Sequence, residues 1–287
     1  MPELPEVETI ARSLRNAPNL AFSPSPGLNK RPGVIGRTVA DVQVNWQRSV
    51  AEPDAPTFCE RLSGQTIAAV KRRAKFLVFQ LDGDWLLIHL RMSGDIRVEP
   101  RSGVPLQAHD RVIFNFKDGA RMVFNDTRKF GRVWLVEDPD SILGCLGPEP
   151  LSTALTPEVF SRSLLQQKRA VKTVLMDQKF LAGMGNIYTD EALHLARIHP
   201  LERASSLEPG RAEGLLSAIR EVLEEGIRRN GASIDWVYRG GDFQNYFRVY
   251  QRTGENCPDC GTKIERIVVS QRGTHFCPTC QPPMIKG

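Results

Sequence analysis

The chain has 287 residues, of which 41% are hydrophobic and 25% are charged. This composition is typical of a soluble globular protein, and the length suits two domains. No apolar run approaches the roughly 18 residues that cross a bilayer, and the acidic, proline-containing N-terminus excludes a secretory signal. We therefore expect no membrane partner and a cytoplasmic location, with nucleoid association if the source is bacterial.

The net charge of +5 suits a polyanionic partner without establishing one. The basic residues gather in clusters, which are either solvated surface faces or groups of phosphate contacts. Because there are three such clusters in one chain, we favour phosphate contacts. The clusters are Lys71, Arg72, Arg73 and Lys75; Arg121, Arg128, Lys129 and Arg132; and Lys168, Arg169 and Lys172.

The first predicted element is a helix over residues 2–17. Pro5 suits a first-turn position, and Glu6 and Glu8 favour the positive end of the helix dipole. The apolar face has three-four spacing and consists of Val7, Ile10, Ala11 and Leu14. Residues 17–33 hold four prolines and two glycines, which predicts a loop.

Residues 34–136 alternate apolar and polar side chains or run through β-branched ones, which predicts strands. Asp82-Gly83 and Asp118-Gly119 are hairpin turn signals, and the short connections favour antiparallel pairing in a sandwich or barrel. After residues 146–151 the pattern becomes helical. Thr156-Pro157-Glu158 is a helix start, and the last long helix has a buried stripe that includes Leu215, Ile219 and Leu223.

The prediction is therefore an α+β fold of two domains. An antiparallel β-sandwich with a flanking helix spans residues 1–140, and a linker spans 141–151. A helical domain follows over 152–249, and a metal-binding module over 250–287.

Four of the six cysteines form two Cys-x2-Cys pairs near the C-terminus. In a chain without a secretory signal, such spacing indicates one structural zinc ion bound by four thiolates, with two disulfides as the alternative. The segment between the pairs reads as strand, turn and strand, with Arg272-Gly273 at the turn. Cys59 and Cys145 are expected to be buried apolar residues. The proposed zinc ligands are Cys257, Cys260, Cys277 and Cys280.

Seven motifs in order resemble the formamidopyrimidine-DNA glycosylase family over essentially the whole chain. They are MPELPEVET, KRRAKFL, IHLRMSG, NDTRKFG, LGPEPL, LMDQKFLAGMGNIYTDE and the zinc module. The resemblance implies a bifunctional base-excision enzyme. Its expected partner is damaged double-stranded DNA, held in a cleft between the β-sandwich and a helix–two-turn–helix domain. It would excise oxidised purines and cleave the strand by β,δ-elimination, acting as a monomer.

The resemblance implies catalytic roles for residues at both ends of the chain. Pro2 would be the nucleophile once Met1 is removed, and Glu3 the acid that protonates the sugar oxygen. Lys75 would contact the damaged nucleotide and assist β-elimination, and Arg272 would serve δ-elimination. Without the resemblance, a terminal proline and a surface acid are the simpler interpretations, and Lys71, Arg72 and Arg73 are expected to be surface charges.

The resemblance also implies DNA contacts. Met92, Arg128 and Phe130 would fill the gap left by the flipped base, although Met92 and Phe130 could instead be core residues. His109, Lys168 and Asn186 would contact the DNA backbone. The other histidines, His89, His194, His199 and His275, are expected to be structural.

The chain departs from one common form of the family pattern at three places. Arg91 stands where some members have glycine, and Thr127 where some have proline; both changes are expected to be mild. The sequence Asn230-Gly231 replaces a double glycine before a loop that caps the flipped base in the family. This last change leaves the lesion preference open.

Two alternatives remain at this point. One is the sister branch that resembles endonuclease VIII and prefers oxidised pyrimidines, although Leu4, Arg128 and Phe130 argue against it. The other is a non-catalytic DNA-binding protein, which would not need Pro2, Glu3, Lys75 and Arg272 together.

Overall fold

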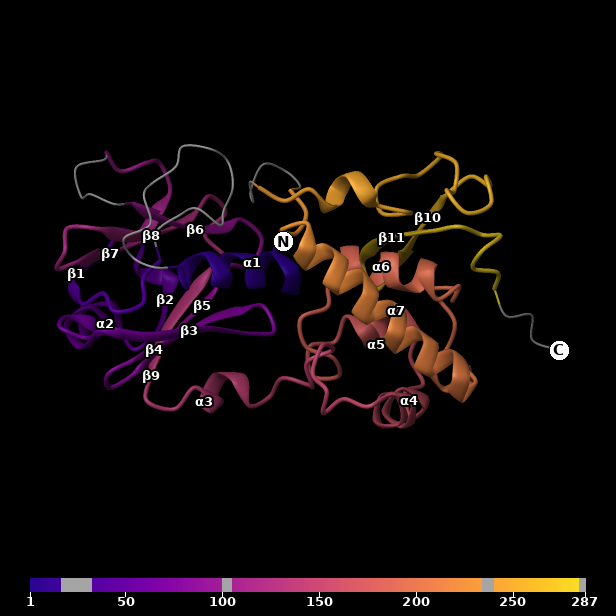
Figure 1. The fold of residues 1–287 in the computed structure, drawn as a ribbon, viewed down its shortest axis with the longest axis horizontal. Coiled ribbons are helices and arrows are strands. Elements are labelled where there is room, and N and C mark those ends of the chain that lie inside the picture. Colours follow the sequence, from indigo (N-terminus) through magenta and orange to yellow (C-terminus); the bar gives the residue numbers. More distant parts are fainter. Residues whose placement is uncertain (17–32, 100–104, 234–239, 284–287) are drawn as a thin grey trace. The chain divides into compact units, whose positions relative to one another are not determined.

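The computed structural model describes residues 1–16, 33–99, 105–233 and 240–283 (Figure 1). The predicted loop at 17–33 therefore lies outside the described residues except for Gly33. The chain divides into two compact units, Met1–Cys145 with Asn230–Asp242, and Leu146–Arg229 with Phe243–Gly287. None of the helices in these described ranges is long and apolar enough to cross a membrane.

The first unit begins with helix α1 (Leu4–Leu14), which confirms the predicted terminal helix. Pro5 lies in its first turn, and Val7, Ile10, Ala11 and Leu14 are all buried. This face packs against the sheet at β3 (Ile67–Arg73) and β4 (Phe76–Leu81), as the indigo helix in Figure 1 shows. The amphipathic pattern thus fixes the N-terminus beside the strands that end near Lys75.

Two sheets and a second helix, α2 (Ala55–Leu62), make up most of the rest of this unit. The remaining strands are β1 (Val39–Val44), β2 (Val50–Glu52), β5 (Trp85–His89), β6 (Gly94–Glu99), β7 (Asp110–Phe116), β8 (Arg121–Asp126) and β9 (Arg132–Val136). One sheet has the order β1-β7-β8-β6 and the other β2-β9-β5-β4-β3. All pairings are antiparallel except β2 with β9, which is parallel.

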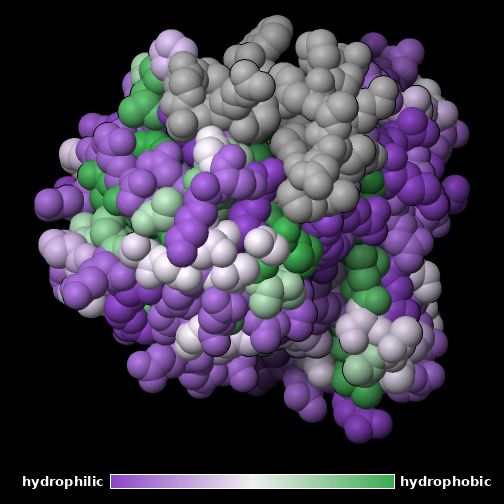
Figure 2. Space-filling view, turned by 60° about the vertical axis from the view of Figure 1, so that its left-hand side comes forward, coloured by the Kyte–Doolittle hydropathy of each residue, from purple (hydrophilic) through white to green (hydrophobic). Residues whose placement is uncertain are grey.

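A single apolar cluster joins the inner faces of both sheets with α1 and α2. Leu77 and Phe79 enter it from one sheet and Phe114 and Phe124 from the other. Phe58 of α2 packs edge-on against Phe114, with ring centroids 6.4 Å apart. Because the inner faces of both sheets share this core, the predicted sandwich is confirmed. In the space-filling view of Figure 2, hydrophilic residues cover most of the visible surface and apolar ones form scattered patches.

Helices dominate the second unit. They are α4 (Pro157–Leu165), α5 (Val171–Leu175), α6 (Asn186–Leu195) and α7 (Pro209–Arg228); the short α3 (Asp140–Leu143) belongs to the first unit. The side chain of Thr156 caps α4 by accepting a 3.3 Å hydrogen bond from the amide of Val159, as its sequence predicts. Strands β10 (Glu265–Val269) and β11 (Arg272–Phe276) form an antiparallel hairpin near the C-terminus. Short 3-10 helices occur at Ala204–Ser206 and Phe243–Tyr246 in this unit and at Gln47–Ser49 in the first unit.

The segment Asn230–Asp242 differs from the expected domain bounds. The predicted helical domain of 152–249 included it, whereas the structure groups it with the first unit. The physical reason is a hydrogen bond of 2.8 Å from the amide of Ala232 to Oε1 of Glu6 in α1. Residues 234–239, which follow within this segment, lie outside the described residues.

Candidate functional site

Pro2 and Glu3 lie at the beginning of α1 and are both buried. Glu3 is the N-cap residue, and its amide donates a hydrogen bond of 2.7 Å to Oε2 of Glu6. The other oxygen of Glu6 binds the amide of Ala232, so one buried carboxylate joins the helix start to a segment 226 residues away. Glu6 therefore does stabilise the helix start, as its sequence position suggested, and it also fixes the place of Pro2 and Glu3 in the first unit.

An ion-pair cluster holds the middle of α1 against β3. Glu8 contacts Nε of Arg72 at 3.0 Å and Nη1 of Arg15 at 3.2 Å, and Nε of Arg15 donates to the carbonyl of Val70 at 2.7 Å. Burial raises the pKa of Glu8, but the positive charges of Arg72 and Arg15 outweigh it and hold that pKa below its ordinary value. The expectation that Arg72 is a surface charge is wrong, because only 10% of its side chain is exposed and it pairs with Glu8.

Lys75 lies in the turn directly before β4. It follows Ala74, whose φ of 52° makes the tight turn between β3 and β4, and it is 4% exposed. His89 lies close enough for the charge of Lys75 to affect it. Burial, followed by the charges of Arg91 and Lys75, lowers the pKa of His89 to about 3. His89 is therefore a neutral imidazole, and its Nδ1 accepts a 3.0 Å hydrogen bond from the amide of Arg91.

Two loops present the predicted gap-filling residues, and one carboxylate holds both loops. Phe130 is 50% exposed and Met92 half-buried, so Phe130 is not a core residue. The guanidinium of Arg128 lies 5.1 Å from the ring centre of Phe130. The structure thus brings Arg128 and Phe130 together, and Ser93, next to Met92, accepts a 2.9 Å hydrogen bond from the amide of Arg128.

Asp126 is the residue that organises these loops, and sequence reasoning missed it. It is fully buried, and one of its oxygens accepts hydrogen bonds from Oγ of Ser93 and from the amide of Arg128. The other accepts a 2.7 Å bond from the amide of Gly131. Carboxylates that receive backbone amides fix tight loops strongly because the bonds are charge-assisted. An aspartate at the end of a strand directly before a turn was the available signal.

The exposed His109 lies on the same sheet, just before β7. Its φ is 75°, its carbonyl accepts a 3.0 Å bond from the amide of Asp126, and its Nδ1 is 3.0 Å from Nη2 of Arg111. The imidazole is thus at the surface, and its backbone is tied to the residue that organises the gap-filling loop.

In the second unit, Ser270 and Gln271 form the turn that joins β10 to β11, with φ of 48° and 63°, and the exposed Arg272 is the first residue of β11. The prediction that Arg272-Gly273 lies at the turn is therefore wrong by two residues, because Arg272 and Gly273 pair with Val269 and Val268 in the hairpin. Nδ2 of Asn186, the first residue of α6, donates a 2.9 Å hydrogen bond to the carbonyl of Gly273. Lys172 also supports β11, because its Nζ lies 2.7 Å from Oγ1 of Thr274. The structure therefore brings Asn186 to the start of β11, next to Arg272 and close to the turn. Lys168 is exposed on the segment between α4 and α5, and nothing in the described contacts joins it to that turn.

Some residues of the three basic clusters, which were predicted to contact phosphate, are buried in ion pairs within the protein. Lys172 is fully buried and pairs with Asp190 at 2.6 Å, so it is not a surface phosphate contact. Arg121 is likewise buried and pairs with Glu99. The interpretation of these two residues as phosphate contacts is wrong, because counting charges along a sequence does not reveal which of them are buried beside an acid.

The four predicted zinc ligands come together. The sulfurs of Cys257 and Cys280 are 3.8 Å apart and those of Cys260 and Cys277 are 3.4 Å apart, and all four lie within 4.8 Å of one another. A tetrahedral zinc with bonds of about 2.3 Å requires sulfur–sulfur distances of about 3.8 Å. The cysteines are free thiols rather than disulfides. The donor set therefore fits a structural zinc, and four thiolates leave no open position for chemistry.

Comparison with known proteins agrees with this arrangement. Family models match residues 25–133 (formamidopyrimidine-DNA glycosylase N-terminal domain), 146–237 (its H2TH domain) and 254–283 (zinc finger found in FPG and IleRS). A formamidopyrimidine-DNA glycosylase from Chloroflexus aurantiacus is 43% identical over 99% of both chains. The chain belongs to the formamidopyrimidine-DNA glycosylase family.

Other family members agree over the same length. The enzyme of this name from Protochlamydia amoebophila is 39% identical over 98% of this chain and 99% of its own. Lactococcus lactis Fpg, solved with DNA containing an abasic site, is 33% identical with a TM-score of 0.85, covering 98% of this chain and all of that one. A second L. lactis complex, with DNA containing FAPY-dG, has a TM-score of 0.86 and 33% identity over the same shares of both chains. The family resemblance found in the sequence is confirmed.

The backbone conformation shows the consequence of two departures from the family pattern. Arg91 has φ 53°, a left-handed conformation that glycine adopts without strain, so the change is less mild than expected. Asn230-Gly231 also turns through positive φ, at 58° and 80°. A Cβ on Gly231 would lie 2.7 Å from Oε1 of Glu6, so glycine is required at the second position of this family member and not at the first.

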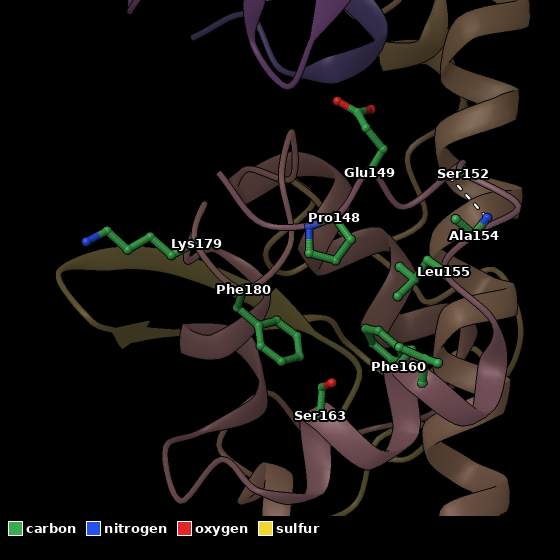
Figure 3. A pocket seen from close by; sticks show the side chains of 10 residues that line it. Pro148, Glu149, Ser152, Ala154, Leu155, Phe160, Ser163, Lys179 and Phe180 are labelled. Atoms are coloured by element: carbon green, nitrogen blue, oxygen red, sulfur yellow. Dashed lines mark hydrogen bonds between the residues drawn. The ribbon is translucent and has the colours of Figure 1, made fainter. Parts of the chain in front are cut away.

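One cavity among the described residues is not part of this site. It has a volume of about 490 Å³ in the second unit and is lined mainly by apolar side chains, among them Leu155, Phe160 and Phe180 (Figure 3). The two phenylalanine rings lie 6.0 Å apart, while the charged ends of Glu149 and Lys179 point away from them. None of the predicted catalytic, DNA-contacting or zinc-binding residues lines it.

One further prediction is corrected. Cys145, expected to be a buried apolar residue, is exposed, and Cys59 is only partly buried. The sulfur of Cys145 lies 3.7 Å from the carbonyl of Ile142, within the loop that follows α3, where no core surrounds it.

Proposed function

We propose that this family member excises oxidised purines, 8-oxoguanine and formamidopyrimidines, from double-stranded DNA and then cleaves the abasic strand by β,δ-elimination. The observation that carries the proposal is the placement of Pro2 and Glu3. Both stand at the start of a helix that Glu6 fixes by two buried hydrogen bonds, beside sheets that hold Lys75 and the gap-filling loops. The solved relatives that contain FAPY-dG or carbocyclic 8-oxo-G in DNA support the choice of lesion.

Removal of Met1 would expose the secondary amine of Pro2. An α-amine titrates near 8, so a useful fraction is neutral at physiological pH, and the helix dipole disfavours its protonated form further. The nitrogen lone pair attacks C1′ of the sugar, the glycosidic bond breaks, and the base leaves with its bonding electrons and gains a proton. The nitrogen loses its own proton, and its lone pair then forms the iminium as the C1′–O4′ bond opens. Because the amine is secondary, the iminium that forms has no N–H proton to lose and remains an electron sink for elimination.

Glu3 would be the general acid in this scheme. It protonates the ring oxygen O4′ as the C1′–O4′ bond opens, which requires a protonated carboxyl within hydrogen-bond reach of that oxygen. Its position next to Pro2 in the helix cap places it one residue from the nucleophile. The residue is therefore well placed to act at the same sugar carbon.

Lys75 and Arg272 would serve the elimination steps. Lys75 contacts the damaged nucleotide and assists loss of the 3′ phosphate, while Arg272 holds a flanking phosphate during the second elimination. The hydrogen bonds that Asn186 and Lys172 donate to the carbonyl of Gly273 fix the start of β11 and support a defined position for that guanidinium within its unit. The four-cysteine zinc site would supply the fold of this hairpin and no chemistry.

Met92, Arg128 and Phe130 would occupy the space that the flipped nucleotide leaves. Filling that space recovers part of the few kcal/mol that unstacking a base costs. Arg128 would bond the orphaned cytosine, and Asp126 would position both loops without touching DNA. His109, Lys168 and Asn186 would contact the DNA backbone, and the protein would act as a monomer.

The test is cleavage of an end-labelled duplex with 8-oxoguanine opposite cytosine. We expect the protein to release the base and give β,δ-elimination products, while Arg272→Ala accumulates the β-elimination product. Lys263→Ala is the matched control, since it removes a positive charge from the same zinc module but lies outside the β10–β11 hairpin that carries Arg272.

Two outcomes would contradict the proposal. One is unchanged β,δ products from Arg272→Ala, which would remove this residue from the mechanism. The other is faster cleavage of thymine glycol than of 8-oxoguanine, which would assign the chain to the pyrimidine-preferring branch.

A further inference from the structure

Helix α6 faces the zinc module with a row of buried polar side chains. Glu191 accepts hydrogen bonds from the amides of Arg248, Val249 and Tyr250, at 2.8, 3.0 and 2.8 Å. Asp190 accepts a bond of 2.9 Å from the amide of His275 in β11. Each carboxylate therefore receives donors from the chain around the zinc module. A third buried polar group on this helix, the imidazole of His194, lies beside the cysteines instead.

His194 is 0% exposed, and its Nε2 lies 3.4 Å from Sγ of Cys257, one of the four thiolates. Its other nitrogen, Nδ1, is buried without a hydrogen-bond partner among the described residues. Asp259 is the nearest acid, but its Oδ2 is 4.0 Å from Nε2, beyond hydrogen-bond reach, and its other oxygen faces Arg248 at 3.7 Å. The close partner of the imidazole is therefore the sulfur.

The position of the ring proton follows from this environment. A proton on Nδ1 would bury an unpaired donor and turn the lone pair of Nε2 towards a thiolate. A proton on Nε2 instead gives an N–H···S hydrogen bond to a negatively charged acceptor, which is a charge-assisted bond. Four thiolates around one divalent ion carry a net negative charge, so such a donor stabilises the occupied site.

We propose that His194 is an outer hydrogen-bond donor to the zinc thiolate of Cys257 and that it slows loss of the metal. The residue would join the zinc site directly to α6, the helix whose Asn186 bonds the carbonyl of Gly273 at the start of β11. Outer-sphere partners of metal ligands commonly change metal affinity by about 10- to 100-fold. This proposal does not depend on which lesion the enzyme excises.

The experiment measures zinc release from the full-length protein into a colorimetric chelator at neutral pH. We expect His194→Phe, which keeps a planar ring but has no donor, to release zinc at least about tenfold faster than the unaltered protein. His194→Gln offers an amide N–H in a similar position and should release zinc at nearly the original rate. His199→Phe is the matched control, because His199 is also buried nearby but bonds the amide of Leu201 and packs on Phe276.

A cobalt-substituted sample separates a donor from a ligand. We expect the absorption bands of a four-thiolate cobalt site in both the unaltered protein and His194→Phe. An unchanged zinc release rate in His194→Phe would overturn the proposal. So would equal acceleration by His199→Phe, which would indicate loosened packing, or a change of the cobalt bands in His194→Phe, which would make the imidazole a metal ligand.

Discussion

His89 is a buried imidazole that remains neutral in the folded chain, with a pKa lowered from 6.5 to about 3 by burial and by the charges of Arg91 and Lys75. Between these two values the unfolded chain binds a proton that the folded chain does not. The free energy of unfolding should therefore fall as the pH falls below about 6.5, by about 1.4 kcal/mol per pH unit from this residue. Above pH 6.5 it should contribute no slope.

Urea unfolding of the unaltered protein and of His89→Gln between pH 7.5 and 5 measures this contribution. The difference between the two free energies should change with pH only below about 6.5. Other groups that titrate in this range cancel in the difference. Parallel curves over the whole range would show that His89 binds its proton at the same pH in the folded and the unfolded chain, which would contradict the lowered pKa.

Substitution of Arg91 tests whether the backbone is strained in the loop that carries Met92. At its φ of 53° a Cβ is strained, and glycine would relieve a cost of about 1 kcal/mol. We expect Arg91→Gly to be about 1 kcal/mol more stable than Arg91→Ala, because alanine removes the guanidinium but keeps the Cβ. Thermal or urea unfolding checks the order, and equal stability of the two variants would refute the strain.

At the scale of elements, Asp126 joins the loop after β8 to the loop after β5. Asp126→Ala leaves the amide of Gly131 without its acceptor and removes one of the two acceptors of the Arg128 amide and the acceptor of the Ser93 hydroxyl, so the free energy of unfolding should fall by about 3 kcal/mol. Discrimination between cytosine and adenine opposite the lesion should also fall, since Arg128 loses its fixed place. Ser93→Ala removes the bond that its hydroxyl donates to Asp126 and the bond that it accepts from Arg128 but leaves Asp126 in place, and it should cost less, about 1 kcal/mol.

Asp41→Ala is the control for Asp126→Ala. Asp41 lies on β1 of the same sheet, and its carboxylate binds the exposed side chain of Asn115. Its loss should change neither stability nor base discrimination appreciably. If Asp126→Ala lowered stability but kept full discrimination between opposite bases, Asp126 would be a structural residue without a positioning role.

Local patterns predicted the elements because each pattern expresses a short-range cause. The three-four spacing of Val7, Ile10 and Leu14 follows from one buried helix face, and Asp118-Gly119 from a turn in which Gly119 has φ 85°. The zinc ligands were predicted because two Cys-x2-Cys pairs separated by a short hairpin are typical of a four-thiolate zinc site.

Long-range pairs could not be predicted in the same way. Arg72 pairs with Glu8, which is 64 residues away in the sequence, and Lys172 of α5 pairs with Asp190 of α6, which is 18 residues away. The charges near each residue in the sequence do not predict either pairing, so both cations are expected at the surface from the sequence alone. The bond from Ala232 to Glu6 spans nearly the whole chain, and only the fold shows that the segment before residues 234–239 is anchored at the helix that begins with Leu4.

At the scale of the whole molecule, the two units have separate apolar cores, and the zinc module has a small one of its own around Val249, Ile264 and Cys277. Because that core is so small, removal of zinc by a chelator should unfold the module. Hydrogen exchange should then show loss of protection in β10 and β11, with β4 and β5 still protected. Retained protection in β10 and β11 would mean that the module folds without metal.

The central claim is that the nitrogen of Pro2 forms a covalent bond with the damaged nucleotide. Borohydride reduction during reaction with a duplex containing 8-oxoguanine opposite cytosine traps such an iminium as a stable amine. Mass spectrometry of the digested adduct should place the sugar on an N-terminal peptide that begins at Pro2, and Pro2→Gly combined with Glu3→Gln should abolish most of the yield. An adduct on a lysine, no adduct at all, or an unchanged yield from the double variant would contradict the mechanism.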